Sequence, residues 1–216
     1  MCTRQRDYAP LRKETYTHGT SGGGCGMSTE SGIRSQLLQS LRTSGAVLLE
    51  EVGLCQGEAR VDILAVSEHD LDGFEIKSEQ DTLGRLPSQV EFYSRVLGRA
   101  SIVAAAKHLN ALPAIVPPWW GIVAAEPDRD GVRLLSLRQG SANPSPDPTA
   151  LAQLLWYEEV EALLAQMDAL RGVRGKARRH LWGRLVERMP EPTLRAAVCH
   201  ALLTRERTFG RGASMR

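Results

Sequence analysis

The chain has 216 residues and a mass of 23.7 kDa, with 42% hydrophobic and 24% charged residues, which is the composition of a globular protein with one core and room for a small appended unit. No apolar run approaches the roughly 20 residues that span a bilayer, so a membrane protein is not expected. The four cysteines form no C-x-x-C pair, which argues against a zinc ribbon or a disulfide framework, and no secretory signal precedes the body, so the expected location is cytoplasmic.

The net charge of +2 conceals an uneven distribution. Residues 171–216 hold twelve lysines and arginines against three acids, which leaves 15 of the 27 basic and 22 of the 25 acidic residues on the rest of the chain. A basic tail on an acidic body is typical of a protein that handles nucleic acid and has a carboxylate site. The alternative is an arginine-rich but merely solvated helix surface.

The chain begins with residues 1–28, which are rich in Gly, Ser and Thr and are predicted to form a disordered leader, with Met27 as an alternative start. An amphipathic helix is expected from Ser28 or Thr29 to about Thr43.

Residues 44–139 alternate between strand-like and helix-like patterns. Strands are expected at Val47–Val52, Ala59–Ser67, Leu71–Ser78, Ser101–Ala106, Trp119–Ala124 and Val132–Leu137, and a helix at Leu86–Leu97. Trp119 and Trp120 are expected to pack in the core or between domains, with stacking on nucleic-acid bases as the alternative. The pattern predicts an α/β fold of the order α-β-β-β-α-β, with a central mixed sheet flanked by helices over residues 29–139.

The remainder is predicted to be helical. Residues 140–148 contain three prolines and form a predicted linker. A small basic helical unit is expected at 149–204, with helices at about 151–167, 176–188 and 193–203, followed by a flexible tail at 205–216.

The clearest candidate site lies on the predicted hairpin. In the segment Glu75-Ile76-Lys77, strand alternation places Glu75 and Lys77 on one face and turns Ile76 into the core. Asp62 on the adjacent strand can point to that face. Two carboxylates can hold Mg²⁺, which lowers the pKa of a bound water and neutralises charge on a phosphodiester, while Lys77 orients the water or steadies the phosphate.

These residues resemble a known superfamily. Asp62, the run Glu75-Ile76-Lys77-Ser78, and a following helix with Gln89-x-x-x-Tyr93 resemble the PD-(D/E)XK nucleases, and the longer segments G-F-E-I-K-S-E-Q-D and V-P-P-W-W-G-I resemble a bacterial family of compact nuclease-like proteins with a helical C-terminal part. The resemblance implies a restriction-endonuclease-like core. Val61 stands where the superfamily motif often has proline, a variation that leaves the aspartate in place.

The resemblance also implies roles for individual residues. Asp62, Glu75 and Lys77 would be catalytic, with Asp62 and Glu75 as metal ligands, and Gln89 and Tyr93 would contact the substrate or support the site. For a third ligand we favour Glu51, with Glu58 and Glu30 as alternatives; Glu50 would face the other way if its strand is regular.

Further substrate contacts are expected from three arginines. Arg60 lies two residues before Asp62, and Arg174 and Arg178 belong to a predicted basic helical stripe that begins at Arg171.

The sequence therefore predicts a nuclease that uses Mg²⁺, with Mn²⁺ as an alternative, and acts on DNA, with RNA left open. A homodimer would suit double-strand cutting, and the helical unit is a candidate docking surface for a partner protein. The competing hypothesis is a non-catalytic nucleic-acid-binding or repair-accessory protein that retains the fold.

Overall fold

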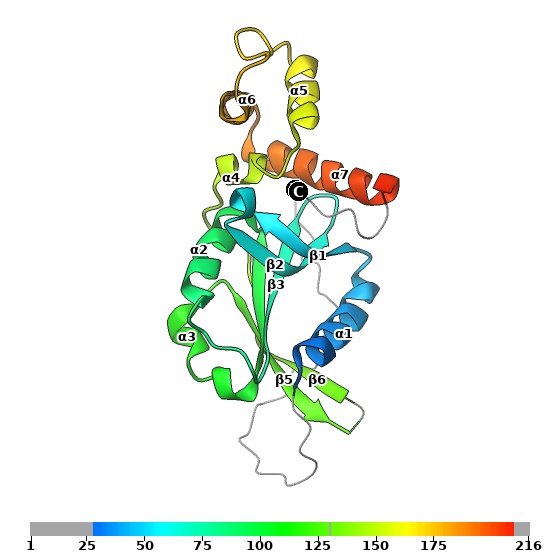
Figure 1. The fold of residues 1–216 in the computed structure, drawn as a ribbon, viewed down its shortest axis with the longest axis vertical. Helices are drawn as coiled ribbons and strands as arrows, with labels where there is room; N and C mark the ends of the chain where they lie inside the picture. The colour runs from blue at the N-terminus through cyan, green and yellow to red at the C-terminus, as the bar shows by residue number, and fades with distance from the viewer. Residues whose placement is uncertain (1–27, 130, 210–216) are drawn as a thin grey trace.

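The computed structural model describes residues 28–129 and 131–209. One six-stranded mixed sheet lies between helices, and further helices gather beyond one end of it (Figure 1). In chain order the elements are α1 Glu30–Leu41, β1 Val47–Leu54, β2 Ala59–Val66, β3 Leu71–Lys77, α2 Leu86–Val96, β4 Arg99–Ala105, α3 Leu112–Ile115, β5 Gly121–Asp128, β6 Gly131–Arg138, α4 Pro148–Ala152, α5 Tyr157–Gln166, α6 Arg178–Arg188 and α7 Glu191–Phe209. The predicted α/β class with a helix-flanked mixed sheet is confirmed.

The strands lie in the sheet in the order in which they occur in the chain. β1 pairs with β2, β2 with β3, and β5 with β6 in antiparallel fashion, whereas β3–β4 and β4–β5 are parallel. Parallel neighbours require a crossover. Helix α2 makes the crossover from β3 to β4, so the end of β3 leads into a helix that packs against β1 and β2.

The sheet buries a separate set of apolar side chains on each face. On the first face, Ile33 and Leu37 of α1 pack against Ile63, Phe74 and Ile76. On the second face a larger cluster runs from the sheet through α2 and continues into α4–α7. The sheet is thus covered by α1 on one side and by α2 and α3 on the other (Figure 1).

Trp119 and Trp120 are buried, with 9% and 0% of their surface exposed, as expected for core residues. The Trp120 ring stacks on the Tyr93 ring of α2 with 5.8 Å between centroids. This contact helps to fix α2 over the sheet, where Tyr93 reaches the candidate site.

The prediction of a single helix at about 151–167 is wrong, because the segment contains two helices, α4 and α5. The Trp156 backbone N–H donates to the Glu159 side chain at 2.8 Å instead of to a helical carbonyl, which marks the start of a new helix. Leu154 and Leu155 lie between the two helices and are also buried, so the apolar sequence pattern continues across the break.

Helix α7 extends to Phe209, beyond the expected end near Leu203. The extra turn is stabilised by Arg205, which is buried, pairs with Glu159, and places its guanidinium 4.1 Å from the centre of the Trp156 ring. Residues 1–27 and 210–216, with most of the predicted leader and the end of the predicted tail, lie outside the described residues.

Among the helices at 28–129 and 131–209, none combines the length and the apolar character needed to cross a lipid bilayer.

Candidate functional site

Strand β3 places Glu75 and Lys77 side by side, as its alternation predicts. Phe74 and Ile76 point into the α1 side of the core, and Glu75 and Lys77 point to the opposite face. The Lys77 Nζ donates to Glu75 Oε1 at 2.5 Å, and both residues are almost fully buried, at 5% and 2% exposure. Burying two charges is costly unless they are paired, so this pair is held by mutual neutralisation.

Helix α2 supplies the next contacts from one of its faces. Gln89 donates to Glu75 Oε1 at 2.6 Å and accepts from Lys77 Nζ at 3.1 Å. The Tyr93 hydroxyl lies 2.5 Å from Glu75 Oε2 and 2.6 Å from the Arg60 carbonyl oxygen. Burial and the charge of Glu75 raise the pKa of Tyr93 above its ordinary value, so the hydroxyl keeps its proton and remains a donor. Gln89 and Tyr93 therefore support Glu75 and Lys77.

The close approach of α2 to β3 depends on Gly73. A Cβ at this position would lie 2.3 Å from Leu97 Cδ1, directly after the helix. The missing side chain leaves room for Leu97 to pack closely on the strand at the end of α2.

Asp62 lies where β2 and β3 separate. The paired register of these strands ends at Ile63 opposite Phe74. Beyond that point the Asp62 Oδ2 accepts the Ile76 backbone N–H at 2.7 Å, in place of a strand-to-strand bond. Asp62 is thereby fixed beside Glu75, which is the convergence that the sequence predicted.

An irregularity in β1 and β2 positions the carboxylates. Glu51 has a φ of 56°, in the left-handed region that is strained for a residue with a side chain. The pairing of β1 with β2 skips Glu51 and Asp62, and Val61 and Ile63 contribute to opposite faces of the sheet. Strand β1 is therefore not regular. The expectation that Glu50 faces away from the site assumed a regular strand, so it does not apply.

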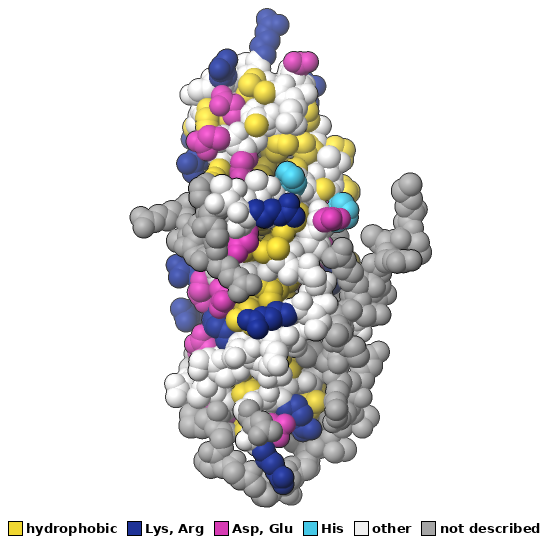
Figure 2. Space-filling view, turned by 90° about the vertical axis from the view of Figure 1, so that its right-hand side faces the viewer, with side chains coloured by type: hydrophobic (Ala, Val, Ile, Leu, Met, Phe, Trp, Pro, Cys, Tyr) yellow, Lys and Arg dark blue, Asp and Glu magenta, His cyan; other side chains and the backbone are white. Residues whose placement is uncertain are grey.

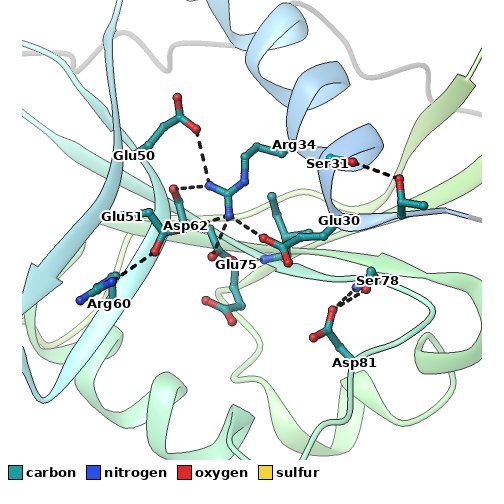
Figure 3. A network of polar contacts seen from close by, with 12 residues as sticks. Glu30, Ser31, Arg34, Glu50, Glu51, Arg60, Asp62, Glu75, Ser78 and Asp81 are labelled. Atoms are coloured by element: carbon teal, nitrogen blue, oxygen red, sulfur yellow. Dashed lines mark hydrogen bonds and ion pairs between the residues drawn. The ribbon is translucent and has the colours of Figure 1, made fainter. Parts of the chain in front are cut away.

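Sequence reasoning missed Arg34 of α1, which lies at the centre of the acidic residues (Figure 3). Its Nη2 lies 2.9 Å from Glu30 Oε1, 3.0 Å from Glu51 Oε1 and 3.2 Å from Asp62 Oδ1. Its Nη1 donates to the Asp62 carbonyl at 3.1 Å and lies 3.6 Å from Glu50 Oε2. The four-residue spacing from Glu30 was a visible sign of a shared helix face, but the sequence did not indicate which strands that face meets.

Electrostatics reflect the crowding of carboxylates. Burial and the charge of Glu75 raise the pKa of Asp62 to about 6, against the opposing effects of the Ile76 N–H and Arg34. At Asp81, burial is outweighed by hydrogen bonds from the Ser78 hydroxyl and N–H, which lower the pKa of that carboxyl. Asp62 is thus the carboxylate whose ionised form is disfavoured most clearly, first by burial and then by the neighbouring charge of Glu75.

These side chains line one hollow of about 460 Å³. Six predicted residues meet there: Glu51, Arg60, Asp62, Glu75, Lys77 and Gln89. The wall also includes Glu30, Glu58, Asp81, Arg85 and Ser88, which brings its acidic side chains to six and its basic side chains to three. The pocket therefore carries a surplus of negative charge.

The donors in the pocket fit a hard divalent cation in kind. Asp62, Glu75 and Glu51 offer carboxylate oxygens, the ligands that Mg²⁺ and Mn²⁺ prefer. In the described part of the chain, no three His, Cys, Asp or Glu side chains are grouped closely enough to form a ready-made metal centre. Asp62, Glu75 and Glu51 are the pocket carboxylates that could hold a cation, but they do not form a preassembled centre.

The predicted helical stripe of Arg171, Arg174 and Arg178 is wrong. Residues 171–175 form turns rather than a helix, because Gly172 and Gly175 adopt left-handed φ values of 83° and 72°. Arg174 is 81% exposed and lies 3.9 Å from Glu161, and Arg178 is exposed at the start of α6. Neither lines the pocket.

The basic tail is also not uniformly available to a ligand. Arg195 is buried and pairs with Glu191 and with Asp70 of the turn between β2 and β3, and Arg205 is buried against Glu159. On the face of the molecule seen in Figure 2, acidic and basic side chains lie interspersed along one edge.

One of the comparisons with known proteins, the match to a family, extends over both parts of the molecule. The family of the bacteriophage P4 protein cII matches residues 27–211. Protein cII of Enterobacteria phage P4 is 27% identical over 123 residues, which cover 57% of this chain and 46% of the phage protein, so the match spans about half the length of that relative. A protein of unknown function from Silicibacter pomeroyi aligns with 64% of this chain and 88% of its own at 19% identity and a TM-score of 0.39. Since the family match takes in the pocket and the helical unit alike, the chain belongs to the bacteriophage P4 protein cII family.

Proposed function

We propose that the protein is a Mg²⁺-dependent nuclease of the PD-(D/E)XK type that hydrolyses phosphodiester bonds in DNA in the cytoplasm. The observation that carries the proposal is the meeting of Asp62, Glu75 and Lys77 in one acidic pocket, with the lysine Nζ 2.5 Å from Glu75. The element order α1-β1-β2-β3-α2-β4 is the order expected for a restriction-endonuclease-like core, which supports the proposal.

In this proposal a divalent cation, Mg²⁺ or Mn²⁺, would be held by Asp62, Glu75 and Glu51, and would supply an acidified water and charge neutralisation at the phosphate. Lys77 is a compact point charge that Glu75 and Gln89 hold in place, where it can steady a phosphate oxygen. Because three donors fix Glu75, it needs little rearrangement to keep its oxygens directed into the pocket.

Substrate binding would fall to basic groups around the pocket and beyond it. Arg60, whose side chain is 69% exposed, and Arg85 at the pocket wall can contact phosphates next to the scissile one. Arg174 and Arg178 on the helical unit would add contacts farther along the backbone. A homodimer would allow both strands of a duplex to be cut, and the helical unit would be the surface for a protein partner.

The test is a plasmid-nicking assay with Mg²⁺ titrated from zero, run on wild type, Asp62→Asn and the surface control Asp128→Asn. We expect Mg²⁺-dependent nicking by wild type and by the Asp128 variant, and none by the Asp62 variant. Single-stranded DNA, duplex DNA and RNA in parallel would define the substrate. Equal nicking by the Asp62 variant would assign any cleavage to another site or to a contaminant.

A second function, non-catalytic nucleic-acid binding, is favoured by one specific observation. Arg34 pairs with Glu30, Glu51 and Asp62, so a side chain of the protein itself partly neutralises the acidic cluster. This alternative predicts salt-sensitive DNA binding with no cleavage at any Mg²⁺ or Mn²⁺ concentration, and no effect of Asp62→Asn on binding.

A further inference from the structure

We propose that Arg34 is a built-in competitor of the divalent cation: its guanidinium occupies the acidic cluster of Glu30, Glu51 and Asp62 in the metal-free protein, and cation binding displaces it from Asp62 and Glu51. This inference rests on the proposed function, because it names what the cation must replace. If so, a residue of α1 controls how tightly the pocket binds a cation.

The contacts of Arg34 match those of a counter-ion. One nitrogen, Nη2, lies within 3.2 Å of a carboxylate oxygen from each of Glu30, Glu51 and Asp62. These acids come from a helix and two strands, and one cation holds them together (Figure 3). All three also line the pocket. A divalent cation held by Asp62 and Glu51 would need two of the three carboxylates that Arg34 contacts.

Asp62 is the residue at which the two cations compete directly. Its Oδ2 already accepts the Ile76 N–H at 2.7 Å, and its Oδ1 lies 3.2 Å from Arg34 Nη2. A cation that binds Oδ1 would meet the positive guanidinium at close range. Like charges at that distance repel strongly in a partly buried site, so the two occupants exclude one another.

Arg34 is also able to leave. Its side chain keeps 17% of its surface exposed, and Glu30, on the same helix one turn away, is 56% exposed. A long arginine stem can therefore turn outward with Glu30 as its remaining partner, without unfolding α1. The ion pair with Glu30 would persist while those with Asp62 and Glu51 are lost.

A purely structural role would have the opposite consequence. If Arg34 only holds the carboxylates in a productive arrangement, its removal loosens them and weakens cation binding. If Arg34 competes, its removal frees Asp62 and Glu51 and strengthens cation binding. The sign of the change in affinity separates the two roles.

The experiment measures Mn²⁺ binding to the full chain by electron paramagnetic resonance of the free ion, with Arg34→Met as the test variant. Arg42→Met is the matched control, because it removes the same charge from an exposed position directly after α1. We expect Arg34→Met to bind Mn²⁺ roughly tenfold more tightly than wild type, which lies inside the usual range for coupling between two ligands. Arg42→Met should stay close to wild type, and an unchanged or weaker affinity in Arg34→Met would overturn the inference.

Two further measurements keep the result decisive. In wild type, which needs no substitution to fold, the Arg34 Nε–H resonance should shift with Mg²⁺ and reach half of its full shift at the binding midpoint; a resonance that stays in place contradicts displacement. Asp62→Asn should abolish Mn²⁺ binding. If Mn²⁺ binds wild type through Asp62 but Arg34→Met gains nothing, only the inference fails, whereas no binding by wild type or Arg34→Met overturns the inference and the proposed metal site together.

Discussion

The pocket and the segment 171–180 carry charge in opposite ways. In the pocket, Glu75 and Lys77 are almost fully buried and each contacts defined partners, whereas Arg174 and Arg178 are exposed on a glycine-containing turn and at a helix start. Buried and fixed charges act at short range with set geometry, which chemistry requires. Exposed charges act at long range and are screened by salt. The first region is suited to reaction and the second to attraction of a polyanion.

Substitution of Lys77 should have the largest effect and tests whether the buried charges of the pocket take part in the reaction. Lys77→Met keeps most of the side-chain length and removes the charge, so metal binding should survive while the turnover of DNA cleavage falls by about 10²–10⁴-fold. The measurement is the single-turnover cleavage rate at saturating Mg²⁺. Lys107→Met, at an exposed position, is the control and should cleave at the wild-type rate. A wild-type rate for Lys77→Met would exclude Lys77 from the reaction.

Asp62 tests whether burial and the neighbouring charge of Glu75 make its ionised form destabilise the metal-free fold. Its folded-state pKa of about 6 lies above the ordinary 3.8, so the folded protein binds the proton more tightly than the unfolded chain. The contribution of Asp62 to stability is therefore fully present below about pH 4 and is lost as pH rises through 6.

We expect the free energy of unfolding of wild type, relative to Asp62→Asn, to fall by roughly 3 kcal/mol between pH 4 and pH 8 without metal. Urea unfolding at a series of pH values measures the difference, and Asn retains an acceptor for the Ile76 N–H. A difference independent of pH would show that Asp62 is not destabilised by its surroundings.

Arg205 allows a buried arginine of the helical unit to be compared with an exposed one. It is buried, unlike Arg174, and its ion pair with Glu159 ties α7 to the start of α5. Arg205→Met should lower the free energy of unfolding by about 2 kcal/mol, the usual range for losing hydrogen bonds to a charged group. The exposed Arg207→Met is the control and should change it by less than about 0.5 kcal/mol. Equal effects would mean that burial does not distinguish the two arginines.

Charge reversal at Arg174 and Arg178 should have the smallest effect on the fold and a measurable effect on DNA binding. The double variant with Glu at both positions should reduce the slope of log K against log salt by roughly 0.9 per lost phosphate contact. Stability should change by less than about 0.5 kcal/mol, since both residues are exposed. Fluorescence anisotropy at several salt concentrations measures the slope. An unchanged slope would remove this segment from the DNA-binding surface.

Local patterns predicted the parts of the site that lie within single elements. Two-residue alternation placed Glu75 and Lys77 together and Ile76 in the core, and helical spacing placed Gln89 and Tyr93 on one face of α2. These periodicities depend only on neighbouring residues, so the sequence contains them.

Features that depend on contacts between distant segments could not be predicted in this way. Arg34 reaches Asp62 across 28 positions of the chain, and the left-handed φ of Glu51 is known only from the structure of β1. The turns after Leu170 are a different case, because Gly172 and Gly175 were visible in the sequence as signals against a continuous helix.

The central claim, a divalent cation held by Asp62 and Glu75, is tested most directly by the effect of Mg²⁺ on thermal unfolding. A ligand that binds only the folded state raises the midpoint of unfolding, and the stabilisation grows with the logarithm of the ligand concentration once that exceeds Kd. Wild type should gain stability with increasing Mg²⁺, and the double variant Asp62→Asn/Glu75→Gln should not. An equal shift in both proteins, or no shift in wild type, would contradict the assignment of the pocket as a metal site.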